Sequence, residues 1–408
     1  MRNVLKELEI LSKKVHDRAY SYSYPKIRRE DVLRSMASVP AITLEITESC
    51  NLSCVYCCYG NLYKKTLKGV KEDKSKILEY LKFLISLRKE YKVDSQLRIA
   101  FYGGEPLLRF DIIKACVALA KSMYQKEKLS FGLTTNGILL TKYMDYLVEH
   151  NFNILISMDG NKENNQYRVD KKGCETFEKV ERNVETLYQE HPAYFDKYVS
   201  ISTVLHNQNN CIEAINYFSK WKKTPIFSQV IDSQSKKSYK RFKEVSQQHK
   251  YTDEEIKSFS KEHQKESKEL FPSFKGNVYG WENNFSTQVP LLEDILFADK
   301  IIYPGKSCFL FSIKIFISVD GSIFVCEKSS RNFMFGKIYP KGIRIFTKRI
   351  NNYYRNINSR HVNQCVSCYK SFNCNLCYFL ESEKINNGSC CYKLEQSTKE
   401  LQQLINFK

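Results

Sequence analysis

Three cysteines lie within eight residues and directly follow an apolar, β-branched segment. Residues 41–47 have the pattern of a buried strand, so Cys50, Cys54 and Cys57 fall on the loop at its carboxyl end. Thiolates at this spacing can ligate three irons of a cubane [4Fe–4S] cluster and leave the fourth iron open to another ligand. Grouped cysteines also form structural zinc sites, so the spacing alone leaves both metals open. With either metal, the sequence predicts a metal centre on the loop that follows this strand.

Strand-like and helix-like segments alternate after this loop. An amphipathic helix is predicted over 76–90, and further strands over 97–102, near 133–135, over 154–160, over 199–205 and over 225–231. Such alternation favours βα units around a parallel sheet, and barrel enzymes of this class place their chemistry at the carboxyl ends of the strands.

Short polar motifs stand where three of the predicted strands end. The second strand runs into Gly103-Gly104-Glu105-Pro106, the third into Asn136-Gly137, and the fourth into Ser157-Met158-Asp159-Gly160. Paired glycines permit a tight turn and a close backbone approach to a ligand, although Asn-Gly and Asp-Gly are also ordinary turn pairs. In this order, together with the cysteine triplet and the aromatic Tyr56, the motifs resemble those of the radical SAM superfamily.

The resemblance implies an α/β fold, a partial (β/α)6 TIM-like barrel, with a [4Fe–4S] cluster whose open iron chelates S-adenosylmethionine. One-electron reduction would cleave this cofactor to methionine and a 5′-deoxyadenosyl radical. The resemblance also implies that the glycine motif binds the methionyl amino group, that Ser157 contacts the ribose or carboxylate region, and that Val204 packs on adenine. The implied cofactor-binding residues are Tyr56, Gly103, Gly104, Glu105, Pro106, Asn136, Ser157 and Val204. Related enzymes carry a longer loop in place of 161–166. Arg168 beyond it could neutralise a carboxylate, but a position at the surface is expected.

A second set of cysteines lies toward the C-terminus. Cys308 and Cys326 flank a predicted hairpin at Asp320-Gly321, and a C-x2-C-x5-C-x2-C pattern follows over 365–377. This set resembles the SPASM domain, the auxiliary-cluster module of peptide-modifying radical SAM enzymes, although the last gap is one residue shorter than usual. The resemblance assigns a distal cluster to Cys365, Cys368, Cys374 and Cys390, and a proximal one to Cys308, Cys326 and Cys377. An open iron, a non-cysteine ligand or Cys391 could complete the proximal cluster, and zinc remains the alternative metal.

Glu327 directly follows Cys326. In sulfatase-maturing relatives an aspartate at the matching position is the base for substrate oxidation, so the resemblance makes Glu327 a candidate catalytic base. A carboxylate near anionic clusters is expected to have a raised pKa. An exposed acidic residue without a catalytic role is the alternative.

Composition and charge limit the classes of protein to which the chain could belong. The N-terminus lacks the apolar core of a signal peptide, no apolar run is long enough to span a membrane, and fifteen cysteines in such a chain favour metal ligation over disulfides. We therefore expect a cytoplasmic metalloprotein. The net charge is +19, and residues 328–380 contain ten Lys or Arg and no Asp or Glu. Most of this charge is interpreted as solvated surface, but an anionic partner is an alternative, nucleic acid being the less favoured one.

Four regions are predicted. Residues 1–40 form a helical extension, with a helix over 3–17, and residues 41–231 form the barrel. Residues 232–300 form an exposed helical linker or insertion, with an element that grips the substrate as the alternative. Residues 301–408 form the auxiliary iron–sulfur domain.

The resemblance predicts a peptide maturase that modifies a ribosomally made precursor by a crosslink, a thioether or a related change. The branch that it most resembles is the Bacteroidales type, which is paired with double-glycine-leader precursors. The expected partners are the precursor peptide and an electron donor such as flavodoxin or ferredoxin. Two alternatives remain, namely an anaerobic sulfatase-maturating enzyme that generates formylglycine and a zinc- or cluster-bearing nucleic-acid-binding protein.

Overall fold

The computed structural model describes residues 26–57, 72–230, 244–246, 310–329, 331–340 and 342–360. Of the auxiliary cysteines predicted above, Cys326 lies within these ranges. Outside the described residues lie the predicted helix over 3–17 and the cysteines Cys308, Cys365, Cys368, Cys374, Cys377, Cys390 and Cys391.

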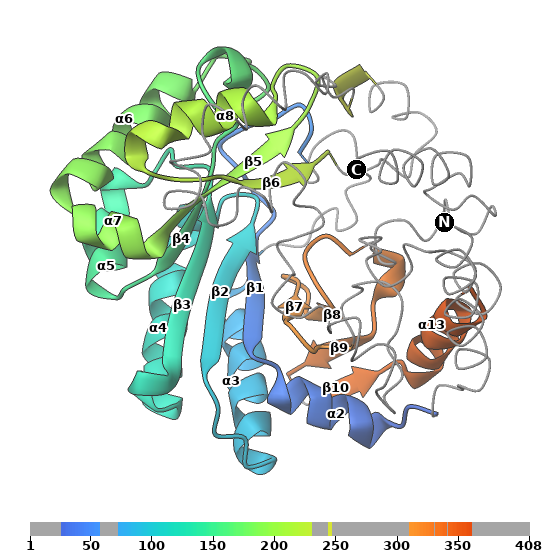
Figure 1. Cartoon of the computed structure of the whole chain (residues 1–408). Helices are drawn as coiled ribbons and strands as arrows, with labels where there is room; N and C mark the ends of the chain where they lie inside the picture. The colour runs from blue at the N-terminus through green and yellow to red at the C-terminus, as the bar shows by residue number, and fades with distance from the viewer. Residues whose placement is uncertain are drawn as a thin grey trace, which may run out of the picture. The chain divides into compact units, whose positions relative to one another are not determined.

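Six parallel strands follow one another in chain order across the sheet (Figure 1). Their bounds are β1 (Ala41–Thr47), β2 (Leu97–Gly103), β3 (Leu129–Thr135), β4 (Asn153–Ser157), β5 (Val199–Leu205) and β6 (Ile226–Gln229). The register places Ala41 beside Arg98 and Leu97 beside Leu129, so the carboxyl ends of the strands meet at one edge of the sheet. The predicted order of parallel βα units is therefore confirmed.

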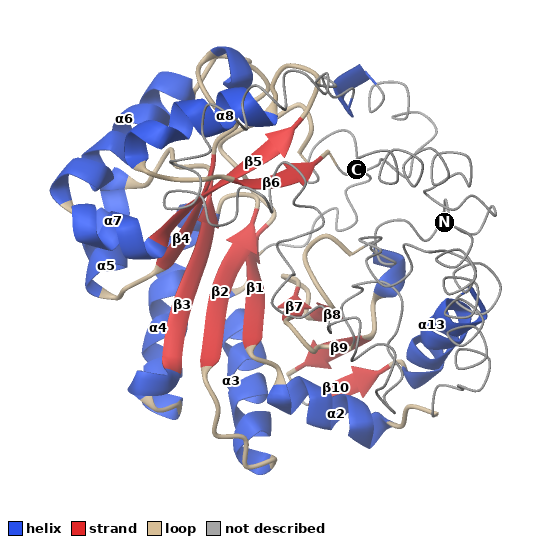
Figure 2. Ribbon diagram, viewed as in Figure 1, coloured by secondary structure: helices blue, strands red, loops and turns tan. Residues whose placement is uncertain are grey.

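Helices connect these strands and cover one side of the sheet (Figure 2). They are α3 (Lys74–Glu90), α4 (Phe110–Met123), α5 (Met144–Glu149), α6 (Phe177–Glu190), α7 (Pro192–Tyr198) and α8 (Cys211–Phe218), with short 3-10 turns η1 (Pro106–Arg109), η2 (Lys126–Lys128), η3 (Thr141–Tyr143), η4 (Glu163–Asn165) and η5 (Ser219–Trp221). Helix α3 begins two residues before its predicted start, because the Asp73 side chain accepts hydrogen bonds from the amides of Ser75 and Lys76 and so caps the helix. Its apolar face, including Ile77, is buried.

Four further strands extend the same sheet beyond β1. They are β7 (Ile315–Ile317), β8 (Ser322–Phe324), β9 (Gly336–Tyr339) and β10 (Gly342–Ile345), and η6 (Arg331–Phe333) precedes β9. Strand β7 pairs in parallel with β1, and β8, β9 and β10 follow as antiparallel neighbours. The buried Glu45 side chain of β1 accepts a hydrogen bond from the Val319 amide at 3.0 Å, which holds the β7–β8 turn against β1. The sequence analysis did not predict that residues 310–346 would continue the barrel sheet.

A buried arginine ties the start of β1 to the first helices. Helix α2 (Arg29–Ser38) precedes β1, and the fully buried Arg88 of α3 donates to the carbonyls of Ala37 and Val39 at 2.9 and 2.6 Å. Residues 28–284 and 309–346 form one compact unit, which holds all ten strands. Within the other unit, Asn351 of α13 (Thr347–Arg360) exchanges two hydrogen bonds with the Ile27 backbone. No helix in the described part of the chain is long and apolar enough to cross a membrane.

Candidate active site

The three cysteines of the triplet lie together on the loop after β1. Cys50, Cys54 and Cys57 form no disulfide, and each thiolate would repel the others. Burial raises the pKa of Cys50 to about 11 and that of Cys54 to about 12, so both are protonated at neutral pH in the absence of a metal. Metal ligation deprotonates a coordinating thiol, and a cubane binds each thiolate at a different iron. Among the described residues, no three Cys, His, Asp or Glu side chains converge on a single metal ion.

The glycine motif lies directly against the strand that leads to the cysteines. The Gly104 amide donates to the Thr47 carbonyl at 2.8 Å, and the Glu105 amide donates to the Ser49 carbonyl at 2.9 Å. Gly103 has a φ of +135°, and a Cβ there would lie 2.1 Å from the Thr47 oxygen. A Cβ on Gly104 would lie 2.3 Å from the Ser49 oxygen. Both positions require glycine because two backbone segments meet without room for a side chain.

Glu105 joins the end of β2 to the end of β3. Its buried carboxylate accepts hydrogen bonds from the Thr135 hydroxyl at 2.9 Å and the Asn136 amide at 2.7 Å. Burial raises the pKa of Glu105 to about 7 even though these hydrogen bonds oppose the shift. The Asn136 side chain in turn donates to the Cys50 sulfur at 3.5 Å and to the Asn51 side chain at 2.8 Å. Glu105 therefore orients Asn136 toward the cysteine loop.

A buried charged cluster holds the other side of that loop. The Tyr56 hydroxyl donates to the Asp159 carboxylate, and Arg168 contacts both Asp159 oxygens, Nε to Oδ2 at 2.9 Å and Nη2 to Oδ1 at 3.0 Å. Nε2 of His206 lies 3.6 Å from Asp159 Oδ2. The expectation that Arg168 lies at the surface is wrong, because only 9% of the residue is exposed. The Arg168 guanidinium pairs with the Asp159 carboxylate, and the spacing of residues along the chain does not reveal this contact.

Residues 167–169 also bind the cysteine loop through the backbone. The Ser53 amide donates to the Val169 carbonyl at 2.8 Å, and the Val55 amide donates to the Tyr167 carbonyl at 3.0 Å. The loop after β4 therefore pairs with the cysteine loop, although the sequence analysis found no role for it.

A small apolar cluster lies beside Tyr56. Tyr56 packs with Val230 and Val245, and Val204 of β5 packs against the same group. Val245 falls in the segment expected to be an exposed linker, but it is 4% exposed and its carbonyl accepts the Asn207 amide. The expectation of exposure is therefore wrong at this residue. The predicted contact of Val204 with adenine stays a prediction.

The candidate base Glu327 has an ion-pair partner. The Lys314 ammonium lies 2.9 Å from one carboxylate oxygen of Glu327 and 2.6 Å from the other. Burial would raise the pKa of Glu327, but Lys314 outweighs burial and the pKa falls below its ordinary value. The expected raised pKa is therefore wrong, because the sequence did not indicate that Lys314 lies against this carboxylate. Burial raises the pKa of the neighbouring Cys326 thiol.

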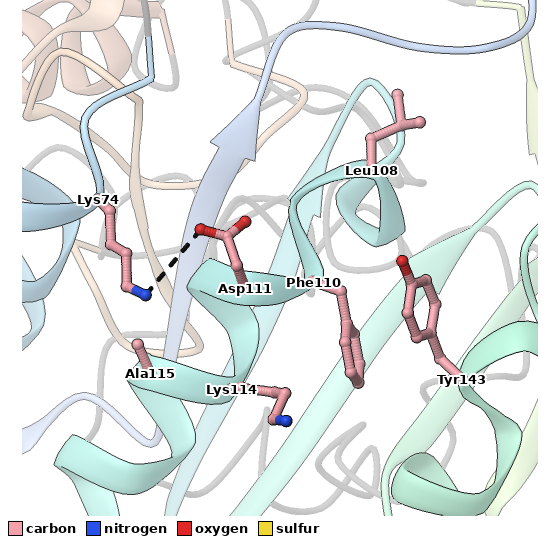
Figure 3. Close-up of a pocket in the computed structure, with 7 residues that line it drawn as sticks. All are labelled: Lys74, Leu108, Phe110, Asp111, Lys114, Ala115 and Tyr143. Atoms are coloured by element: carbon pink, nitrogen blue, oxygen red, sulfur yellow. Dashed lines mark ion pairs between the residues drawn. The ribbon is translucent and has the colours of Figure 1, made fainter.

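A separate hollow of about 640 Å³ lies among helices outside the strands (Figure 3). Lys74 and Asp111 form an ion pair of 4.0 Å at one side, and Phe110 and Tyr143 face each other at the other, with ring centroids 4.0 Å apart. None of the site residues predicted from the sequence lines this hollow. The candidate site is therefore the strand-end cluster and not this pocket.

Comparison with known proteins identifies the strand-end cluster. Residues 44–215 match the radical SAM superfamily. The chain carries a radical SAM domain. The radical SAM cyclopropyl synthase TigE of Paramaledivibacter caminithermalis is 26% identical over 195 residues, which are 45% of this chain and 39% of TigE. A serine-type anaerobic sulfatase-maturating enzyme of Bacteroides thetaiotaomicron is 32% identical over 144 residues, 34% of each chain. The matched region spans less than half of either relative.

Solved structures of radical SAM proteins resemble the chain over a longer stretch. Native anSMEcpe with bound AdoMet gives a TM-score of 0.52 at 21% identity, over 90% of this chain and 100% of that one. The same protein with AdoMet and the Cp18Cys peptide gives 0.51 at 20% identity, over 90% and 98%. This likeness supports the predicted partial barrel.

The cofactors of a radical SAM domain are S-adenosylmethionine and a [4Fe–4S] cluster. The described residues fit the cluster, since three neighbouring thiols share one loop and Cys50 accepts hydrogen bonds from the Leu52 amide and the Asn136 side chain. Such N–H donors stabilise ligating thiolates. The strand ends bring together the triplet, Tyr56, Gly103, Gly104, Glu105 and Asn136, as expected, and Ser157 ends β4. The cofactor contacts themselves stay predictions.

Sequence reasoning missed the partners of Tyr56. Arg168 was expected to be a surface cation, and His206 was not considered. No local pattern distinguishes Arg168 from the other basic residues among the 64 in the chain. One indication was available for Arg168: it lies close in the sequence to a predicted cofactor loop, and a buried charge must have a partner of opposite charge.

Proposed function

We propose that the chain is a radical SAM enzyme that reductively cleaves S-adenosylmethionine and uses the resulting 5′-deoxyadenosyl radical to modify a ribosomally made peptide. The single observation that supports this best is the meeting of the cysteine triplet with the Gly103-Gly104-Glu105 turn at one edge of the sheet. The peptide substrate is supported by anSMEcpe, whose structure has been solved with a bound peptide. We place this activity in the cytoplasm, with flavodoxin or ferredoxin as electron donor.

When bound, the cluster and S-adenosylmethionine supply the one-electron cleavage that generates the radical. Cys50, Cys54 and Cys57 would hold the cluster. The Gly103–Gly104 backbone packs directly against Thr47 and Ser49, and so would present its turn to the methionyl group beside the cysteine loop. Glu105 accepts hydrogen bonds from the Leu107 amide of η1 and from Thr135 and Asn136 at the end of β3, and so fixes the orientation of Asn136. The apolar wall of Tyr56, Val204 and Val230 would exclude water from a reactive radical.

Anaerobic reduction in the presence of S-adenosylmethionine tests the first half of the proposal. We expect 5′-deoxyadenosine from the native chain and none from Cys54→Ala. Cys174→Ala is the matched control, because Cys174 is an exposed cysteine outside the triplet and its loss should leave the yield unchanged. Cys368→Ala, in the predicted auxiliary set, should retain much of the cleavage. No 5′-deoxyadenosine from the native, iron-loaded chain would refute the proposal.

Sulfatase maturation is the second candidate. It is supported by the 32% identity to the serine-type maturase of Bacteroides thetaiotaomicron. The two candidates differ in their product, so mass spectrometry should be run on two peptides, one from a small open reading frame beside the gene and one from a sulfatase. Formylglycine in the sulfatase peptide, with no change in the other, would replace the first candidate by the second. A crosslink or thioether in the precursor would support the first.

Metal analysis tests the non-enzymatic alternative. About twelve irons per chain would agree with one cluster in the barrel and two in the predicted auxiliary domain, at four irons per cubane. Stoichiometric zinc in place of iron would instead support a zinc-bearing nucleic-acid-binding protein, the alternative that the net charge of +19 allows.

A further inference from the structure

Asp159 and Arg168 form a buried ion pair beside the cysteine loop. The Asp159 side chain is fully buried and that of Arg168 is 10% exposed. Burying two charges costs desolvation energy that their attraction repays only with good geometry and further hydrogen bonds, so such a pair is a weak source of stability. A role in placing nearby groups is the alternative explanation, and the contacts of the pair can be followed to see which groups it places.

The contacts of the pair lead to the cysteine loop. Asp159 accepts from the Tyr56 hydroxyl, and Tyr56 lies between Cys54 and Cys57 in the chain. The guanidinium carbon of Arg168 lies 5.5 Å from the centre of the Tyr56 ring, a cation–π distance. The backbone on both sides of Arg168 accepts the Ser53 and Val55 amides. Cys54 is therefore enclosed by residues that the pair holds.

Other elements fix the pair from behind. The Val204 amide donates to Asp159 Oδ1 at 3.0 Å, and Nε2 of His206 faces Oδ2 at 3.6 Å. The His206 ring stacks on the Tyr56 ring, with centroids 5.4 Å apart. Because Val204 of β5 and His206 just beyond the strand contact the carboxylate and the aromatic ring, the pair has little freedom to move relative to the sheet.

The two charges act on the cysteine loop in opposite directions. Arg168 and Asp159 both contact Tyr56, which stands two residues after Cys54, so the cation favours negative charge on this part of the loop and the carboxylate disfavours it. Both are shielded from water, so their fields are weakened less than those of surface charges. A cluster that gains an electron becomes more negative, so a nearby cation raises its reduction potential and a nearby anion lowers it.

We propose that Asp159 and Arg168 are positioning residues that hold Tyr56 and the Cys54 segment, and that their balanced charges set the reduction potential of the cluster at the triplet. This inference rests on the proposed function, because it requires a cluster at Cys50, Cys54 and Cys57. It assigns to the loop after β4 a role in supporting the cluster loop.

The deciding experiment is a redox titration followed by electron paramagnetic resonance, on the full-length, iron-loaded chain without S-adenosylmethionine. The barrel cluster is recognised as the signal that changes when S-adenosylmethionine is added afterwards. We expect the potential to become more negative in Arg168→Gln and more positive in Asp159→Asn. The double variant should return close to the native value, and Arg168→Lys should shift less than Arg168→Gln because it keeps the charge.

Lys162→Gln is the matched control. Lys162 is a cation in the same loop, but it is half-exposed and pairs outward with Glu178 at 2.9 Å. Its loss should leave the potential unchanged. Shifts of the same sign in Arg168→Gln and Asp159→Asn, or shifts no larger than that of the control, would overturn the inference while the native chain still showed its cluster. A native chain without any signal sensitive to S-adenosylmethionine would overturn the proposed function, and this inference with it.

Hydrogen exchange on the metal-free chain tests the positioning role separately. Loss of a buried hydrogen bond should increase local opening, so the peptide containing Ser53 and Val55 should exchange about tenfold faster in Tyr56→Phe and Arg168→Gln. Lys162→Gln should exchange at the native rate. Native rates in all three variants would show that the pair does not hold the cysteine loop.

Discussion

Replacement of Gly103 by alanine tests whether the approach of two backbones makes the glycine motif necessary. Gly103 and Gly342 both have a positive φ, +135° and +146° respectively. An alanine at either site carries a conformational cost of about 1–3 kcal/mol. A Cβ at Gly342 would meet no atom within 4 Å, whereas one at Gly103 would lie 2.1 Å from the Thr47 carbonyl oxygen. Gly342→Ala is therefore a control with the same backbone cost and no collision.

The additional cost at Gly103 can be estimated from the hydrogen bonds at stake. The collision must separate the ends of β1 and β2, which breaks the bonds from the Gly104 and Glu105 amides to Thr47 and Ser49. At about 1 kcal/mol net for each bond, Gly103→Ala should lose about 2 kcal/mol more than Gly342→Ala. The free energy of unfolding from urea denaturation followed by circular dichroism measures this difference.

The same change should disturb the cysteine loop, because Ser49 directly precedes Cys50. We expect Gly103→Ala to take up less iron at the triplet than Gly342→Ala under identical reconstitution. Equal losses of stability and equal iron uptake in the two variants would refute the argument from close backbone approach.

Three further changes test other parts of the structure. Burial opposes the ionisation of Asp320, but hydrogen bonds from Lys337, Ser318 and Ser322 together lower its pKa from 3.8 to about 2. After solvent screening Asp320 should contribute about 1 kcal/mol above pH 4, which is lost as the pH falls toward 2, and Asp320→Asn should flatten this part of the stability profile. Burial raises the pKa of Glu105 from 4.5 to about 7, so the free energy of unfolding should fall by up to about 3 kcal/mol as the pH rises from 4.5 to 7. Glu105→Gln should abolish this dependence on pH, as measured by urea titrations at each pH. Arg88→Met should lower the free energy of unfolding by about 2–4 kcal/mol, because it leaves the buried carbonyls of Ala37 and Val39 without a donor; an unchanged urea midpoint would contradict this.

Local patterns were enough to predict most of the parallel sheet. Strand β5 was predicted with its observed bounds, and helix α3 was predicted to within two residues at its start. These successes have a common reason: the periodicity of apolar residues and the turn motifs act between neighbours in the chain. The grouping of the triplet with Gly103 and Gly104 followed from the same rule, because parallel strands place their carboxyl ends at one edge.

The errors concern partners that are distant in the chain or that change a local environment. Arg168 was expected at the surface, but Asp159 and Tyr56 enclose it. Glu327 was expected to have a raised pKa, but Lys314 lies against it and lowers the pKa. Burial and pKa depend on every group within a few ångströms, and spacing along one segment does not report those groups.

By itself, the sequence determined the chemistry available at the strand ends, namely three thiols, a glycine turn and the polar residues that follow. Tertiary structure decided how these are held. It paired β7 with β1 across more than 270 residues, with Ile42 beside Ile315, and so extended the barrel sheet. It also brought Asp159, Arg168 and His206 against Tyr56. The physical reason is that ligand identity is a property of single side chains, whereas burial, charge pairing and sheet neighbours arise only when distant segments meet.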